Sequence, residues 1–244
     1  MGRLARKAAS SDFYHIVTRG SGKQILFEDD ADKSSFMDCL REGCSASDVS
    51  IIAWCLMSNH VHLVLRGKLE DVSKMMHGLL VRFARRYNAR SGHAGPVFQE
   101  RFSSFPIEGE EYLLEAVRYV HNNPAKAGIC PADEYGWSSY GEYVGTPEYV
   151  SVDLILEMLG GPGRFAEFCR AAPGVPYFVG RGGRVPDEDA VEVASAALGM
   201  HPGDVKALPR PLRDDALRRL RERRFTIKQI ERLTGVGRGI ISRA

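Results

Sequence analysis

The pattern of apolar and polar positions predicts that strands and helices alternate through residues 12–150. Runs of alternating or continuous β-branched and aliphatic residues indicate strands, whereas apolar positions three and four residues apart indicate helices. Strands are expected at 13–19, 50–57, 60–66 and 97–105, and helices at 32–46, 70–90 and 110–122. This order suits an α+β domain of the ferredoxin-like kind, in which helices cover an antiparallel sheet.

The flanking residues predict a different organisation. Residues 1–11 are expected to form a flexible tail. Residues 151–209 are expected to form a helical connector that contains a Gly/Pro-rich linker at 173–186. Residues 210–244 predict a small all-helical domain, so the chain is expected to hold two folded parts joined by the connector.

The last 35 residues indicate helices with a turn at Gly235. The expected helices are Leu212–Arg224, Ile227–Leu233 and Arg238–Arg243. This part carries eleven Lys and Arg against four Asp and Glu, a net charge of +7, whereas the rest of the chain carries −5. Concentrated positive charge is typical of nucleic-acid binding. The segment resembles the helix-turn-helix at the DNA-binding end of the replication initiator DnaA, which makes Arg238 and Arg243 candidate DNA contacts; the alternative is a plain helical hairpin.

Composition adds the expected compartment. The chain has 244 residues, of which 44% are hydrophobic and 26% charged, as is usual for a soluble globular protein. No apolar run is long enough to span a bilayer, and the basic residues near the start are not followed by an apolar stretch. Five scattered cysteines without a Cys-x-x-Cys spacing indicate reduced thiols. We therefore expect a cytoplasmic, nucleoid-associated protein without a membrane partner.

Two histidines one residue apart, His60 and His62, stand at the start of the third expected strand. Side chains at i and i+2 of a strand point to the same face, so the two imidazoles lie about 7 Å apart along the strand. Such a pair can converge on one divalent metal ion. The alternative is a pair of core histidines, and this strand alone does not decide between the two.

The helix expected at 110–122 brings a second set of polar groups. Tyr119 and Asn123 are four residues apart and share a face of a continuous helix. The Asn amide oxygen offers a third metal ligand, and the Tyr phenol offers a nucleophile. Because Pro124 disfavours helical geometry at Asn123, the helix is expected to end close to it. His121 is expected to face away from Tyr119.

Together these motifs resemble the HUH-type tyrosine transposases of the IS200 kind, and more closely their REP-associated relatives. The resemblance covers roughly residues 10–145. It rests, in order, on Phe13–Gly20, Gln24–Phe27, Ala53–His62, Arg82–Asn88, Gly95–Phe102, Tyr119–Gly128 and Trp137–Tyr140. It implies a single-strand DNA endonuclease and strand transferase that acts on hairpin-forming repeats.

The resemblance also implies roles for the candidate site. Tyr119 would be the nucleophile that forms a 5′-phosphotyrosine, and His60, His62 and Asn123 would hold Mg²⁺ or Mn²⁺. The implied partner is single-stranded or hairpin DNA, and no small-molecule organic cofactor is expected. A monomer and a homodimer are both compatible with the family.

The same motifs suggest further site residues and alternative functions. Arg82, Arg85 and Arg86 interleave with aromatic residues and, with Arg101, are candidates for phosphate contacts; the alternative is a solvated helix face. His15 fits either a core position or the neighbourhood of the site. The main alternative function is a catalytically retired DNA-binding protein that uses the helix-turn-helix. A relaxase, whose tyrosine often precedes its histidines, and an RNA-binding sheet agree less well with the motif order.

Overall fold

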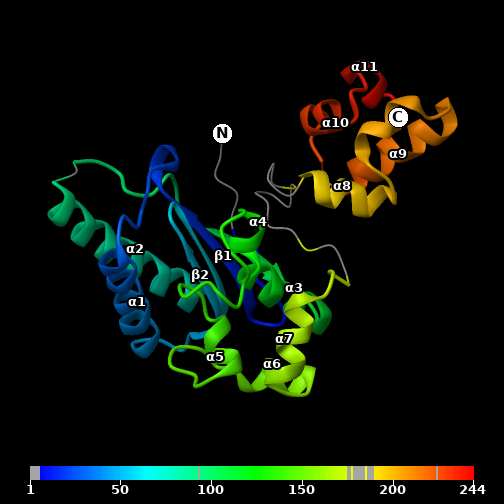
Figure 1. Ribbon diagram of the computed structural model, residues 1–244. Coiled ribbons are helices and arrows are strands. Elements are labelled where there is room, and N and C mark those ends of the chain that lie inside the picture. Colours follow the sequence, from blue (N-terminus) through cyan, green and yellow to red (C-terminus); the bar gives the residue numbers. More distant parts are fainter. Residues whose placement is uncertain (1–5, 93, 175–176, 178–184, 186–189, 224) are drawn as a thin grey trace. The chain divides into compact units, whose positions relative to one another are not determined.

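A computed structural model describes residues 6–92, 94–174, 177, 185, 190–223 and 225–244. The chain divides into two compact units, Met1–Pro173 and Gly174–Ala244, and both are drawn in Figure 1. This division differs from the expected boundaries at residues 150 and 209. Each unit is described by itself.

The first unit is built on a four-stranded antiparallel sheet with the strand order β2-β3-β1-β4. Its elements follow in the order β1 (Phe13–Arg19), α1 (Asp30–Ser45), β2 (Ser50–Met57), β3 (His60–Arg66), α2 (Leu69–Ser91) and β4 (Ser103–Ile107). A β-α-β-β-α-β chain in this strand order is the ferredoxin-like arrangement. The predicted α+β class, with helices on an antiparallel sheet, is therefore confirmed.

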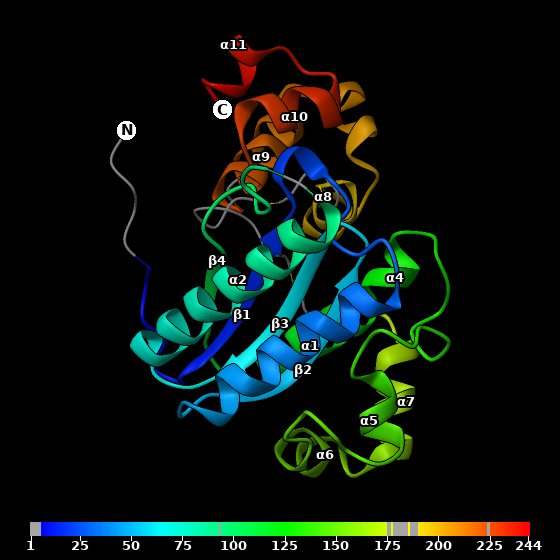
Figure 2. The same cartoon turned by 90° about the vertical axis from the view of Figure 1, so that its left-hand side faces the viewer.

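The two faces of the sheet are covered by different helices (Figures 1 and 2). Helices α1 and α2 pack on one face, where an aromatic cluster of Phe27, Phe36 and Phe83 fills the space between them and the sheet. Helix α3 (Glu110–His121) lies across the other face. Because side chains alternate along β3, Val61, Leu63 and Leu65 face α1 and α2, whereas the two histidines and Val64 face α3.

The fourth strand lies later in the chain than the sequence predicts. The pattern placed it at 97–105, whereas β4 spans Ser103–Ile107. Part of the earlier segment instead extends the pairing beyond the end of β1, where Phe98 bridges to Gly20 and the Gln99 amide donates to the Arg19 carbonyl at 2.9 Å. The apolar pattern runs through both pieces, so it could not show the break between them.

The outer edge of β2 is closed by the chain that follows α3. The Leu56 amide donates to the Trp137 carbonyl and the Ser139 amide to the Trp54 carbonyl, both at 2.9 Å. Three short helices then complete the unit, α5 (Tyr140–Val144), α6 (Asp153–Leu159) and α7 (Pro162–Arg170). The Tyr143 ring stacks on Phe165 of α7 at 4.3 Å between ring centroids. Residues 151–173 therefore belong to the first unit, although the sequence suggested a separate connector.

The described part of the N-terminal segment is packed against the sheet. The Ala9 amide donates to the Tyr14 hydroxyl at 2.9 Å, and Ser10 bonds the Glu108 carboxylate through both its amide and its hydroxyl. Arg6 lies over the Phe102 ring, 3.8 Å from its centroid. Residues 6–11 thus have a fixed place, in contrast to the expected flexible tail, of which residues 1–5 lie outside the described residues.

The second unit is a small helical bundle. It contains α8 (Ala190–Leu198), a 3-10 turn η3 (Pro202–Ala207), α9 (Arg210–Glu222), α10 (Ile227–Thr234) and α11 (Arg238–Ile241). A reciprocal capping box between Thr226 and Gln229 starts α10, and Gly235 ends it in the left-handed conformation at φ 66°. The core includes Leu217, Ile230 and Ile241, each with no exposed surface. Most of the expected linker at 173–186 lies outside the described residues.

Candidate active site

The two histidines of β3 stand side by side on the face of the sheet that carries α3. The centroids of the His60 and His62 rings are 5.0 Å apart. A two-residue turn, Ser58 and Asn59, joins β2 to β3 and places His60 at the first position of the strand. His62 is 3% exposed, whereas His60 is half-buried. The strand therefore presents one imidazole at the opening of the site and one at its floor.

Hydrogen bonds at Nδ1 define which nitrogen each histidine presents. His60 Nδ1 lies 2.7 Å from Asn59 Oδ1, which is an acceptor, so His60 donates its Nδ1 hydrogen there. His62 Nδ1 lies 2.9 Å from Nε2 of the buried His15. When His62 donates its Nδ1 hydrogen to His15 Nε2, His60 and His62 each carry their hydrogen on Nδ1. The nitrogen that keeps a lone pair is then Nε2 in both rings. Nε2 with a lone pair is a metal-binding nitrogen.

Tyr119 lies against this pair from α3. Its ring centroid is 5.6 Å from that of His62 and 5.6 Å from that of His15, both in edge-on contacts. The side chain is 6% exposed. The aromatic contacts fix the phenol beside the histidine floor, one layer above the sheet.

Asn123 follows one turn later, and the proline beside it is accommodated by a break in the helix. Helix α3 ends at His121, and a short helix α4 (Asn123–Lys126) begins with Pro124 in its first turn, where no amide hydrogen is needed. The Asn123 side-chain amide donates to the Tyr119 carbonyl at 3.1 Å. That bond uses the amide nitrogen, so Oδ1 is the atom of Asn123 that could hold a metal ion.

The donor set fits a divalent metal ion. Two imidazoles and one carboxamide oxygen from His60, His62 and Asn123 suit Mg²⁺ or Mn²⁺, and also the borderline ions that prefer nitrogen. Within the described residues no group of three or more His, Cys, Asp and Glu is placed to hold a metal. Asparagine is not among those residue types, so that finding does not bear on a set completed by Asn123.

Burial and neighbouring bases keep the histidine floor uncharged. Burial lowers the pKa of His15 to about 3. Burial also lowers the pKa of His62 well below its usual value, and the nearby His60, His15, Arg19 and Lys126 lower it further. Both rings are neutral at physiological pH, which is the state that binds a metal. Two of these neighbours, Arg19 and Lys126, are cations at physiological pH, so they favour a negatively charged ligand.

The rear of α3 is anchored to the end of α7. Arg118, which is 3% exposed, pairs with Glu115 one turn earlier and donates to the carbonyls of Phe168 and Ala172 at 3.2 and 3.1 Å. The Asn122 side chain donates to the Cys169 carbonyl at 2.8 Å. These contacts lie on the side of α3 that faces away from the histidines. They hold in place the helical segment that carries Tyr119.

His121 faces away from the site. Its Nε2 lies 2.7 Å from the Ser139 hydroxyl, and its ring packs against Tyr143 and Phe165 at 5.5 Å between centroids. Burial lowers its pKa to about 3. The side chain belongs to the packing between α3 and the covering helices.

The arginines expected to contact DNA phosphates lie elsewhere. Arg82 and Arg86 are on α2, on the opposite face of the sheet from Tyr119, and pair with Glu42 of α1 at 3.7 and 3.5 Å. Arg85 is exposed on the same helix. Arg101 is exposed just before β4. Burial is the larger cause that lowers the pKa of the Arg6 guanidinium, and Arg101 lies close enough to Arg6 to lower that pKa further. The structure does not bring these four side chains together with Tyr119.

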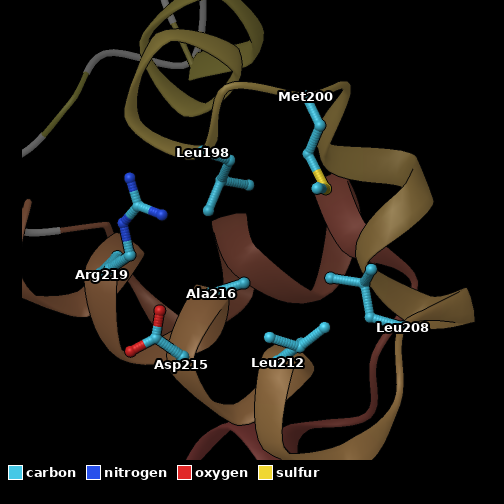
Figure 3. Close-up of a pocket in the computed structure, with 7 residues that line it drawn as sticks. All are labelled: Leu198, Met200, Leu208, Leu212, Asp215, Ala216 and Arg219. Atoms are coloured by element: carbon cyan, nitrogen blue, oxygen red, sulfur yellow. The ribbon is translucent and has the colours of Figure 1, made fainter.

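In the second unit Arg238 pairs with Glu231 of α10 at 2.6 Å, and Arg243 is exposed. A hollow of about 120 Å³ opens beside α9 (Figure 3). Its lining is mainly aliphatic, with Met200 and Leu212 at the rim. Arg219 at its edge donates to the Ala197 carbonyl at 2.5 Å. The hollow is therefore a gap at the margin of the small core.

The sequence reading missed three polar neighbours of the site. Asn59 bonds His60, Arg19 lies opposite His60 in the β1–β3 pairing, and the Lys126 ammonium lies over the Tyr119 ring, 4.5 Å from its centroid. Lys126 is seven residues after Tyr119, a spacing that marks the same helix face. The expected break at Pro124 hid that signal.

A family model and solved structures match parts of this chain. Residues 9–123 match the family model described as "Transposase IS200 like". The fold is similar to a solved structure of a REP-associated tyrosine transposase bound to a REP hairpin, at 14% identity and a TM-score of 0.55, over 74% of this chain and 98% of that one.

A putative transposase from Deinococcus radiodurans R1 matches at 18% identity and a TM-score of 0.35, over 50% of this chain and 95% of that one. No curated protein matches the sequence. Within the described residues no helix is long and apolar enough to cross a membrane.

Proposed function

We propose, on the premise that residues 9–123 belong to the IS200-like transposase family, that this protein cleaves and rejoins single-stranded DNA through a covalent tyrosine intermediate. The observation that carries the proposal is the contact of the Tyr119 ring with His62, with Asn123 one helical turn further on. A phenol nucleophile beside a three-ligand metal site can cleave a phosphodiester without a nucleotide cofactor.

The reaction is a transesterification. Tyr119 Oη attacks a backbone phosphorus in line, the bond from phosphorus to the 3′ oxygen breaks, and a 5′-phosphotyrosine forms. A 3′-hydroxyl can reverse the step, because one phosphodiester is exchanged for another and no bond energy is lost. The fixed position of the Tyr119 ring supplies the orientation that such an attack needs.

His60, His62 and Asn123 are the proposed ligands of Mg²⁺ or Mn²⁺. The ion would polarise the scissile phosphate and offset the charge that grows in the transition state. His15 and Asn59 hold the ligand rings by their Nδ1 bonds. A phenol has an unperturbed pKa near 10, so the polarised phosphate compensates for a weak nucleophile at neutral pH.

The proposed substrate is single-stranded DNA that folds into a hairpin. The solved structure with the same fold was determined with a REP hairpin bound. In this chain the two cations near His62, Arg19 and Lys126, favour a polyanion. For this reason we take hairpin-forming repeats near the gene as the first substrates to examine.

The second unit is proposed to add duplex DNA binding. Helices α10 and α11 are joined by a turn at Gly235, and the surrounding segment carries a net charge of +7. In a helix-turn-helix the second helix enters the major groove with its N-terminal residues. Arg238 and Arg243 would then contact DNA, and Arg82, Arg85, Arg86 and Arg101 remain candidate contacts of the first unit.

The test is covalent adduct formation with purified protein. Wild type and Tyr119→Phe are incubated with end-labelled hairpins from the flanking repeats, with Mn²⁺ or with a chelator, and are separated on a denaturing gel. We expect an adduct with single-stranded hairpins that requires Mn²⁺, and no adduct with Tyr119→Phe or with duplex DNA. Hairpin binding without any adduct would favour the alternative of a retired nuclease that binds DNA through its helix-turn-helix.

A further inference from the structure

A third residue shares the helix face of Tyr119 and Asn123. Lys126 lies seven residues after Tyr119, and the helical path continues across the break because the Lys126 amide donates to the Asn122 carbonyl at 3.0 Å. A spacing of four and then three residues keeps all three side chains on one face. The Lys126 ammonium accordingly lies 4.5 Å from the centroid of the Tyr119 ring.

A second cation reaches the same place from the sheet. Arg19 is paired with His60 across β1 and β3, and alternation along β1 puts it on the same face as His15. Burial and the two neighbouring histidines have the larger effects in lowering the pKa of the His62 ring. Arg19 and Lys126 both lie close enough to this buried ring to lower its pKa further. The two cations therefore approach the same histidine from different elements.

Exposure orders these groups from floor to opening. Tyr119, His62 and Asn123 are 6%, 3% and 9% exposed. Arg19 is half-buried and Lys126 is exposed. The two cations therefore lie closer to solvent than the Tyr119, His62 and Asn123 side chains.

We propose that Lys126 and Arg19 form a clamp for the scissile phosphate, which they hold by its non-bridging oxygens. This inference rests on the proposed transesterification. As the bond from Tyr119 Oη to phosphorus forms and the bond to the 3′ oxygen breaks, the phenol proton leaves to solvent and the 3′ oxygen takes one up. Negative charge stays on the non-bridging oxygens throughout, where fixed cations stabilise it.

The first experiment measures the rate of adduct formation on a hairpin that the wild type cleaves. Lys126→Gln keeps a polar side chain only one atom shorter and removes its charge, and we expect the rate to fall about 100-fold. Lys126→Arg restores a cation and is expected to recover much of that loss. Lys74→Gln, on the exposed side of α2 across the sheet, is the matched control and is expected to leave the rate unchanged.

The second experiment separates a phosphate contact from a structural role. A methylphosphonate at the cleaved position replaces one charged non-bridging oxygen with a methyl group. If Lys126 acts on that charge, its substitution by Gln slows cleavage of the phosphodiester but has little effect on the methylphosphonate. Where the wild type does not cleave the methylphosphonate, the same comparison is made on Kd in the Tyr119→Phe background.

The outcomes are distinguishable. An equal loss on both substrates, or no loss with Lys126→Gln, overturns the clamp while the tyrosine nuclease stands. A loss with Lys126→Gln that Lys126→Arg does not relieve, together with a lowered Tm, also contradicts it. A wild type that forms no adduct overturns the proposed function itself, and the clamp with it.

Discussion

At the scale of single residues, the site is organised by hydrogen bonds that set imidazole tautomers. His60 is held by Asn59 and His62 by His15. Each bond occupies Nδ1, so the two Nε2 atoms can serve one ion. A ligand that is already oriented loses less conformational entropy on binding, which is why such outer partners matter for metal affinity.

We expect His15→Leu to weaken Mn²⁺ binding by about tenfold, because His62 loses the partner that fixes its ring. His15→Gln, which keeps a hydrogen-bonding group, should recover part of the affinity. The measurement is a Mn²⁺ titration followed by electron paramagnetic resonance. His77→Leu, on the exposed side of α2, serves as the control. An unchanged Kd in His15→Leu would show that the His15 contact is only packing.

His121 makes a separate prediction about pH. Its pKa is about 3 in the folded protein against about 6.5 in the unfolded chain. The unfolded chain therefore binds the proton first, so stability is complete above pH 6.5 and is lost as the pH falls towards 3. The linkage relation gives a loss of about 2 kcal/mol at pH 5 from this residue.

Urea unfolding of the wild type and His121→Gln at pH 7.5 and pH 5 measures that loss. The variant should lose less of its free energy of unfolding between the two pH values, whereas the exposed His77→Gln should behave like the wild type. Equal pH dependence in all three proteins would refute the assignment.

Residue spacing alone predicted part of this site. The two-residue period of a strand places His60 and His62 on one face. The four-residue spacing of a helix turn places Tyr119 and Asn123 on one face. Arg19 and Asn59 could not be assigned in the same way, because their roles depend on strand register and on a turn geometry that the sequence pattern does not encode.

At the scale of elements, the helix of Tyr119 is positioned from behind. Arg118 is buried with Glu115 and bonds the carbonyls at the end of α7. A buried charge that loses its partners is costly. The strand pairing was predictable from the apolar runs, but this anchor was not, since it joins residues about 50 positions apart.

We expect Arg118→Ala to lower the free energy of unfolding by about 3 kcal/mol, because the buried Glu115 carboxylate loses its ion pair with Arg118. Arg164→Ala, which breaks an exposed ion pair with Glu167 on α7, should cost about 0.5 kcal/mol or less. Denaturant titration compares the two variants. Similar small losses in both would show that the buried pair does not anchor α3.

At the scale of the whole molecule, the chain combines an α+β unit with a small basic helical unit. The composition predicted two parts, yet the boundary falls after Pro173 because α6 and α7 pack on the first unit. The sequence of a short amphipathic helix does not show which partner its apolar face will cover. For this reason the sequence could not assign α6 and α7 to the first unit.

Truncation after Pro173 should preserve adduct formation on single-stranded hairpins, because the candidate site lies wholly in the first unit. Affinity for duplex DNA should fall by about 100-fold, as expected when one of two linked binding units is removed. In the full chain, Arg238→Ala with Arg243→Ala should reduce the salt slope of duplex binding by about 2. Unchanged duplex affinity after truncation would argue against the proposed helix-turn-helix.

The central claim is that Tyr119 is the nucleophile, and tandem mass spectrometry of the covalent complex tests it most directly. Wild-type protein is trapped on a hairpin with Mn²⁺ and digested with nuclease and protease. The site of the remaining nucleotide is then read from the peptide that contains both Tyr112 and Tyr119. We expect a 5′-phosphotyrosine at Tyr119, which is buried beside His62. A nucleotide on the exposed Tyr112, or an adduct that persists in Tyr119→Phe, would contradict it.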